Sequence, residues 1–257
     1  SPSFQFYLFI VTFLTMLFIS LTFRSKKTWL SGFLLLILFG FFNVATDQSR
    51  QLLGLSLFIY LKDKLGSRRV FISGLIAGLV HVSNIILGPV VYIGLYLDRK
   101  KKTIPDMLYY LLLLLSVIAG TMKYMERVIS YFLNSYVSHS TYLMQKFYSN
   151  DEVGFGLMIY RSVLGLILIS FFHYQKKSVG FNMLLIGLCL QISSLGFMPI
   201  ERIGNSFFYL GLLLASRYEL LVNLRNWKVI SVYLYACLYF IQTNIMDIEK
   251  NGSVPWY

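Results

Sequence analysis

Charged side chains are scarce in this sequence, and acidic ones are the scarcest. Asp, Glu, Lys and Arg make up 13% of the 257 residues, against about 25% in soluble domains. Hydrophobic residues reach 57%, and the mean hydropathy is +0.66. The apolar residues form continuous runs that suit helical spans of ~20 residues, and they lack the ~10-residue alternation of barrel strands. The sequence therefore predicts an all-α integral membrane protein, a polytopic bundle of about ten transmembrane helices.

Metal-binding and nucleotide-binding motifs are missing as well. The two cysteines, Cys189 and Cys237, lie in apolar runs and cannot form a CxxC site, and there is no HExxH, HxxxH or Cys/His cluster. The sequence also contains no Walker A loop, no GxGxxG, no GxSxG and no DxD pair. These absences argue against ATP hydrolysis and against metal-dependent glycosyl transfer. We therefore expect no cofactor and no metal ion.

The apolar runs follow one another along a single expected domain, residues 1–257. Several runs are shorter than ~20 residues, so tilted helices, half-helices or buried helix ends are expected. The chain begins Ser-Pro-Ser and enters an apolar run at once without a signal-peptide pattern, so we expect further spans upstream. The expected spans are 4–23, 29–45, 49–61, 69–83, 85–97, 104–121, 155–172, 179–197, 203–221 and 228–243.

The net charge of +12 is distributed unevenly between the loops. Sixteen of the 23 Lys and Arg residues fall in one set of alternate loops, which holds only four of the 11 acidic residues. The positive-inside rule makes this set cytoplasmic. The basic excess is then a signal of topology and does not indicate a nucleic-acid partner. The longest connection, about 122–154, lies on the outer side and is rich in aromatic residues, and a connection of this length is more often functional than passive.

A polar island, Asn43–Gln51, separates two long apolar runs on the outer side. Thr46 or Asp47 can cap a helix whose first turn contains Arg50 and Gln51. Free backbone N–H groups, the positive end of the helix dipole and a guanidinium would then converge, a combination that suits phosphate or pyrophosphate. The alternative is an arginine that reaches from the end of a span to lipid phosphate.

Other polar side chains are expected on the same outer side. His81 ends an apolar run, where it either forms hydrogen bonds or transfers protons, or is an ordinary helix-end residue. Glu201 and Arg202 precede an aromatic-rich span, where they form either a functional acid–base pair or a local ion pair that closes the span. Arg161 is an intramembrane cation that needs a partner. Arg127 belongs to an amphipathic stretch of the long loop.

These elements resemble the bacterial polysaccharide polymerases of the Wzy/EpsG-like group. In this sequence Arg50-Gln51 is followed about thirty residues later by His81-x-Ser83, and Glu201-Arg202 precedes an aromatic span. The resemblance implies a GT-C-like glycosyltransferase of the bacterial cytoplasmic (inner) membrane, with its active site on the extracytoplasmic side. Such an enzyme joins oligosaccharide repeat units carried on undecaprenyl pyrophosphate, as in O-antigen or exopolysaccharide assembly, without a metal ion.

The resemblance also implies roles for individual residues and for partners. The base that activates the attacking sugar hydroxyl is Glu201, His81 or Asp47. Membrane lipid surrounds the protein, and a chain-length regulator protein is an allowed partner. The residues implied to bind the pyrophosphate are Arg50, Gln51, Arg127, Arg161 and Arg202.

Two other functions remain open. A lipid-linked oligosaccharide flippase or polysaccharide exporter could use the same arginines to bind pyrophosphate without any chemistry. A membrane O-acyltransferase could use His81 as the base and Arg50 to hold a carrier. The aromatic outer loop favours a transferase over a flippase, because a transporter must also offer its site to the inside.

Overall fold

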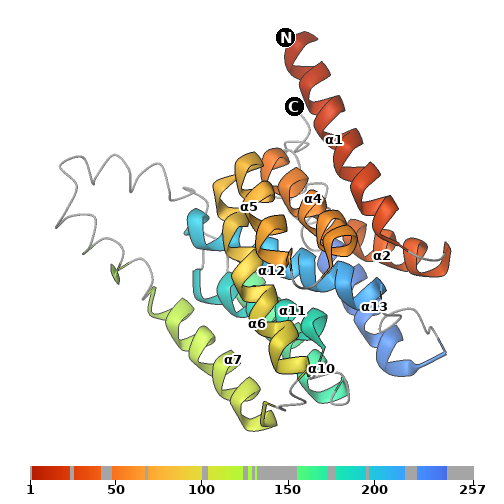
Figure 1. The fold of residues 1–257 in the computed structure, drawn as a ribbon. Helices are drawn as coiled ribbons and strands as arrows, with labels where there is room; N and C mark the ends of the chain where they lie inside the picture. Colours follow the sequence, from red (N-terminus) through yellow and green to blue (C-terminus); the bar gives the residue numbers. More distant parts are fainter. Residues whose placement is uncertain are drawn as a thin grey trace. The chain divides into compact units, whose positions relative to one another are not determined.

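The fold of the described residues is helical throughout its regular structure. The computed structural model describes residues 2–23, 26–41, 48–66, 69–99, 104–123, 127–128, 131, 155–172, 178–194, 197–217 and 225–241. Within these ranges no β-strand occurs, which confirms the all-α prediction (Figure 1). The helices are α1 (Pro2–Thr22), α2 (Lys26–Leu38), α4 (Ser49–Leu65), α5 (Val70–Val80), the 3-10 helix η2 (Val82–Ile86), α6 (Leu87–Arg99), α7 (Asp106–Thr121), α10 (Phe155–Phe171), α11 (Val179–Ser194), α12 (Met198–Arg217) and α13 (Trp227–Ile241).

Each expected span corresponds to one of these α-helices, but most of the helices are short. Among the described helices, only the Ser3–Thr22 segment of α1 is both long and apolar enough to cross a membrane by itself. Seven further apolar helices have lengths of 10–17 residues. The helix positions agree with the sequence pattern, whereas the number of spans, about ten, stays a prediction.

The start of α12 differs from the expected start at residue 203. The helix begins at Met198, and Pro199 lies in its first turn. A proline fits there because the first N–H groups of a helix have no intrahelical acceptor, so the ring removes no hydrogen bond. As a consequence, Glu201 and Arg202 belong to the helix and not to a loop before it.

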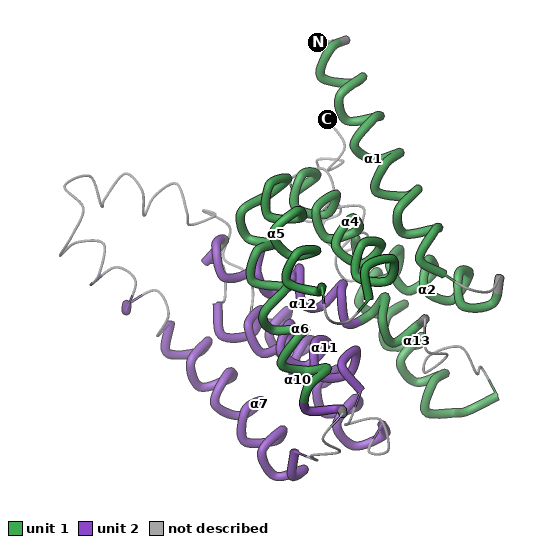
Figure 2. The backbone as a smooth tube through the Cα atoms, in the orientation of Figure 1, with its two compact units in different colours: residues 1–96, 212–257 green, residues 97–211 purple. Residues whose placement is uncertain are grey.

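The chain divides into two compact units (Figure 2). Unit 1 comprises residues 1–96 and 212–257, and unit 2 comprises residues 97–211. The boundaries fall within α6 and α12.

Unit 1 is built around α4, which packs against both α1 and α5, while α2 packs against α13. The core side chains of α4 include Leu52, Leu55 and Ile59, each at most 1% exposed. Their spacing of three and four residues places them on one helix face. In contrast, α1 exposes Phe6 and Phe9, an apolar surface of the kind that a helix presents to lipid.

Unit 2 contains α7, α10 and α11, which pack against one another, and the first part of α12. Glycines allow α11 and α12 to approach backbone to backbone. A Cβ at Gly187 would overlap the backbone nitrogen of Phe208 and lie 2.8 Å from the Gly204 carbonyl oxygen. A Cβ at Gly211 would likewise overlap the backbone nitrogen of Leu184. Close approach through small residues is the usual way in which membrane helices associate.

Gly187→Ala is therefore expected to destabilise the protein by about 1–3 kcal/mol, the usual effect of overpacking. The new methyl group would meet backbone atoms, which cannot rotate away. Gly165→Ala is the matched control, because its Cβ would meet the Leu113 side-chain atom Cδ1 at 2.9 Å, and that side chain can rotate. Thermal unfolding of the detergent-purified variants measures both effects, and equal losses would contradict the backbone contact.

Candidate functional site

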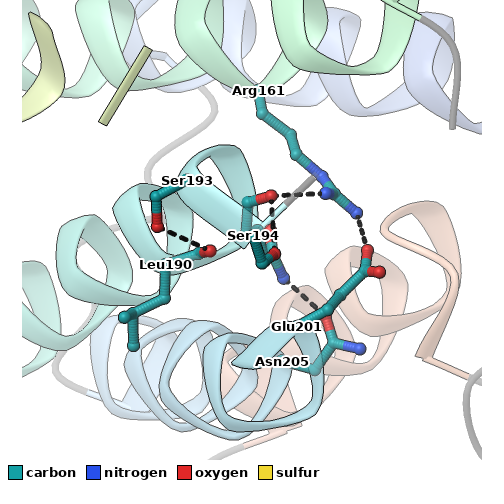
Figure 3. A network of polar contacts seen from close by, with 7 residues as sticks. Arg161, Leu190, Ser193, Ser194, Glu201 and Asn205 are labelled. Carbon is teal, nitrogen blue, oxygen red and sulfur yellow. Dashed lines mark hydrogen bonds and ion pairs between the residues drawn. The ribbon is translucent and has the colours of Figure 1, made fainter. Parts of the chain in front are cut away.

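A partly buried ion pair joins two helices of unit 2. Arg161 on α10 donates from Nη2 to Glu201 Oε1 at 2.7 Å (Figure 3). The side chains are 8% and 20% exposed, respectively. Glu201 lies in the first turn of α12, where a carboxylate also interacts favourably with the positive end of the helix dipole. The anionic partner that the sequence required for Arg161 is therefore Glu201.

A third helix, α11, completes this polar cluster through its C-terminal turn. The carbonyl oxygen of Gln191 accepts a hydrogen bond from Arg161 Nη1 at 3.0 Å and another from Ser194 Oγ at 3.1 Å. The Gln191 side chain donates from Nε2 to Asn205 Oδ1 at 2.6 Å. Asn205 lies one turn after Glu201 on α12, so the two residues share a face. Figure 3 shows Arg161 reaching across to this turn of α12.

The sequence predicted Arg161 and Glu201 but missed Gln191 and Asn205. Gln191 interrupts an apolar run, and an amide at that depth must find a partner because an unsatisfied buried polar group is costly. Asn205 carries a recognisable signal too, since it follows Glu201 by four residues. Both side chains are buried, at 5% and 7% exposure. The cluster therefore joins three helices, because α11 and α12 hold the guanidinium that Arg161 extends from α10.

In unit 1 the structure brings the Arg50-Gln51 and His81-x-Ser83 elements together. Gln51 is 1% exposed, and its carbonyl oxygen accepts a hydrogen bond from Asn84 Nδ2 at 2.9 Å. Asn84 follows Ser83 directly and is fully buried. Two motifs that are 30 residues or more apart in the chain are thus neighbours in the fold, linked by a residue that the sequence motif does not include.

His81 occupies the corner between α5 and η2. Its backbone is extended, with φ −155° and ψ 123°, so it ends one helix and precedes the next. Its side-chain atom Nδ1 lies 2.7 Å from Ser83 Oγ. The hydroxyl thereby fixes the orientation of the imidazole ring. A fixed orientation is what a side chain needs if it is to exchange a proton with a particular group.

Arg50 is exposed in the first turn of α4, as the sequence predicts. The predicted cap is different: Gln48 takes the N-cap position, with no side-chain hydrogen bond to the helix. A glutamine side chain is too long for the short-range cap that Ser, Thr, Asp or Asn provide. Thr46 and Asp47, including the role of Asp47 as a base, lie outside the described residues.

The remaining predicted arginines are found in unit 2. Arg127 is exposed and helical, and its backbone N–H donates to the Lys123 carbonyl oxygen at 3.1 Å. Arg202 is half-buried on α12, directly after Glu201. Most of the predicted loop, about 122–154, lies outside the described residues. Across the residues that are described, no three His, Cys, Asp or Glu side chains gather as ligands of a metal ion would.

Comparison with known proteins gives one family. The model of the EpsG family matches residues 1–256 of the chain. No curated protein and no solved structure shows a significant match.

Proposed function

The chain belongs to the EpsG family, and we propose that it is a polymerase of undecaprenyl-pyrophosphate-linked oligosaccharide repeat units. Proteins of this family are membrane proteins of polysaccharide biosynthesis. We place the reaction on the outer face of the cytoplasmic membrane, where the distribution of Lys and Arg over the loops positions Arg50 and His81. The family match over nearly the whole chain is the observation that carries this proposal.

The reaction requires two kinds of group from the protein. A sugar hydroxyl of the acceptor forms a glycosidic bond to the anomeric carbon of the donor sugar, and the bond from that carbon to the pyrophosphate oxygen breaks. The hydroxyl proton passes to a base, and the bonding electron pair leaves with the undecaprenyl pyrophosphate. Cationic side chains stabilise the negative charge that develops on the leaving group, and the proposal assigns this role to arginines without a metal ion.

Arg50 is the arginine best suited to the pyrophosphate. It is exposed, and it lies at the start of α4, where unbonded backbone N–H groups and the helix dipole favour an anion. Arg127 and Arg202 are further candidates for the same role. Arg161 is less suited, because Glu201 and the Gln191 carbonyl already hold its guanidinium.

The ion pair also favours His81 over Glu201 as the base. A proton taken up by Glu201 would leave the Arg161 guanidinium nearly buried without a counter-charge, and breaking a buried pair costs about 3–5 kcal/mol. His81 can take up a proton without such a loss, and Ser83 holds its ring in place. We therefore assign His81 as the base. The Arg161–Glu201 pair then fixes the turn of α12 that carries Arg202.

Complementation of a null strain tests the proposal through the length of the surface glycan on a gel. The wild-type chain is expected to restore a ladder of polymer, whereas Arg50→Ala and His81→Ala should leave single repeat units on the acceptor. Arg69→Ala is the matched control, because it removes an arginine from the opposite, cytoplasmic set of loops. Immunoblots of the membrane fraction establish that all the variants are present.

Two other outcomes would contradict a polymerase. Loss of all surface glycan, with lipid-linked repeat units retained in the cytoplasm, would indicate a flippase or exporter. A glycan of normal length that lacks acyl groups would indicate an O-acyltransferase.

A further inference from the structure

Asn84 links the two elements on which the proposed function rests, although neither motif contains it. The residue is 0% exposed. Its side-chain Nδ2 donates to the Gln51 carbonyl oxygen at 2.9 Å, across 33 residues of sequence. Its backbone N–H donates to the His81 carbonyl oxygen at 2.9 Å. One residue therefore holds both the corner that carries His81 and the turn of α4 that carries Arg50.

The surroundings of Asn84 are shaped to receive its amide group. Gly54 follows Gln51 by one helical turn, so both residues face the same side of α4. A Cβ at Gly54 would overlap Asn84 Nδ2 and lie 2.9 Å from the Ala77 carbonyl oxygen. The amide thus occupies space that any residue other than glycine at position 54 would fill. This fit fixes where the amide lies and which backbone carbonyl it can reach.

The Gln51 carbonyl oxygen does not need the hydrogen bond from Asn84 in order to have a partner. A carbonyl oxygen in the first turn of a helix accepts a bond from the N–H four residues later, and it has a second lone pair for Asn84. An apolar side chain of similar size at position 84 would therefore leave no backbone group of α4 unsatisfied. What it would remove is the connection between α4 and the His81 corner.

We propose that Asn84 is a positioning residue, which fixes the His81 imidazole relative to the Arg50 turn through its bond to Gln51. This inference rests on the proposed function, in which His81 accepts the proton and Arg50 binds the pyrophosphate. A displacement of about 1 Å between such groups lowers the rate of a reaction by roughly a hundredfold. Asn84 acts through His81 and Arg50 and makes no contact with the substrate.

Asn84→Leu separates this role from a packing role. The variant keeps the branching and the number of heavy atoms of the side chain but loses the amide. It is expected to lower kcat by about tenfold or more, while KM for the lipid-linked donor changes by less than about threefold. Ser73→Ala is the matched control, because Ser73 is equally buried. Its hydroxyl donates to the backbone carbonyl oxygen of Arg69, four residues earlier in the chain, and so makes no link to α4. Ser73→Ala should leave both constants unchanged.

A double-mutant cycle with His81→Ala identifies the group through which Asn84 acts. In the His81→Ala background, Asn84→Leu is expected to lower the residual rate by less than about twofold, because the base that it positions is gone. A purely structural role would lower the rate by the same factor in both backgrounds. That multiplicative result would overturn the inference.

A second measurement does not depend on catalysis. Diethylpyrocarbonate modifies exposed histidines, and mass spectrometry of the peptides resolves His81 from His139 and His173. We expect His81 to react several-fold faster in Asn84→Leu and in Gly54→Ala than in the wild type or Ser73→Ala. Unchanged rates would overturn the positioning role. A wild-type chain that makes no polymer would instead overturn the proposed function, while the modification rates would still decide whether Asn84 holds His81.

Discussion

Arg161→Met is expected to destabilise the protein by about 3–5 kcal/mol, because it leaves the Glu201 carboxylate without its ion-pair partner. Glu201 keeps one-fifth of its side-chain exposure, which places the effect toward the lower end of that range. The substitution also removes the hydrogen bond from Arg161 to the Gln191 carbonyl, so α10, α11 and α12 lose a common point of attachment. Less folded protein should reach the membrane, and the detergent-purified remainder should unfold at a lower temperature.

The double variant Arg161→Met/Glu201→Gln tests whether the charge pair is the cause. Removing both charges leaves no unpaired carboxylate, and buried pairs can often be replaced by neutral groups with little loss. The double variant should therefore regain most of the lost stability, so that the effects of the two substitutions are far from additive. Additive losses in thermal unfolding would show that the pair does not hold these helices. Since the double variant is expected to fold, its polymer ladder also reports whether the charges are needed beyond folding.

Arg50→Ala is expected to have the largest effect on activity with the smallest effect on folding. A charge-assisted hydrogen bond to a developing negative charge contributes about 2.7–4 kcal/mol to the transition state, or roughly a hundredfold or more in rate. Arg50 is exposed, so its removal leaves no buried group without a partner. The thermal midpoint should therefore stay at the wild-type value while kcat/KM for the lipid-linked donor falls.

Arg50→Lys distinguishes recognition of pyrophosphate from simple attraction of charge. Lysine keeps the positive charge but cannot form the two parallel hydrogen bonds of a guanidinium. We expect an intermediate loss, of about tenfold, in the same kinetic assay. Full activity in Arg50→Lys would indicate that only the charge matters, and full activity in Arg50→Ala would remove Arg50 from the site.

The helix positions could be predicted from the sequence because each long apolar run corresponds to one helix. The start of α12 could not, because Pro199 is equally compatible with the end of a loop and with the first turn of a helix. The cap of α4 was misplaced for a related reason. Several consecutive polar residues could fill the N-cap position. Which of them does so depends on the backbone conformation before the helix, and the local sequence does not specify it.

The candidate residues could be predicted better than their partners. Arg161 and Glu201 stood out because charges in apolar segments require compensation. That they compensate each other depends on how α10 and α12 pack, which no local pattern encodes. Asn84 was overlooked because an asparagine at the end of a span is ordinary in sequence. Its proposed role depends on the contact with Gln51, which the glycine at position 54 makes room for.

Reconstitution of the purified full-length protein in liposomes is the most direct test of the central claim. The vesicles contain a synthetic undecaprenyl-pyrophosphate-linked repeat unit and no other enzyme. We predict that the wild-type protein converts these units into a ladder of polymers and releases undecaprenyl pyrophosphate with each bond formed, and that Arg50→Ala does so far more slowly. Repeat units that remain single in the presence of folded wild-type protein would contradict the assignment as a polymerase.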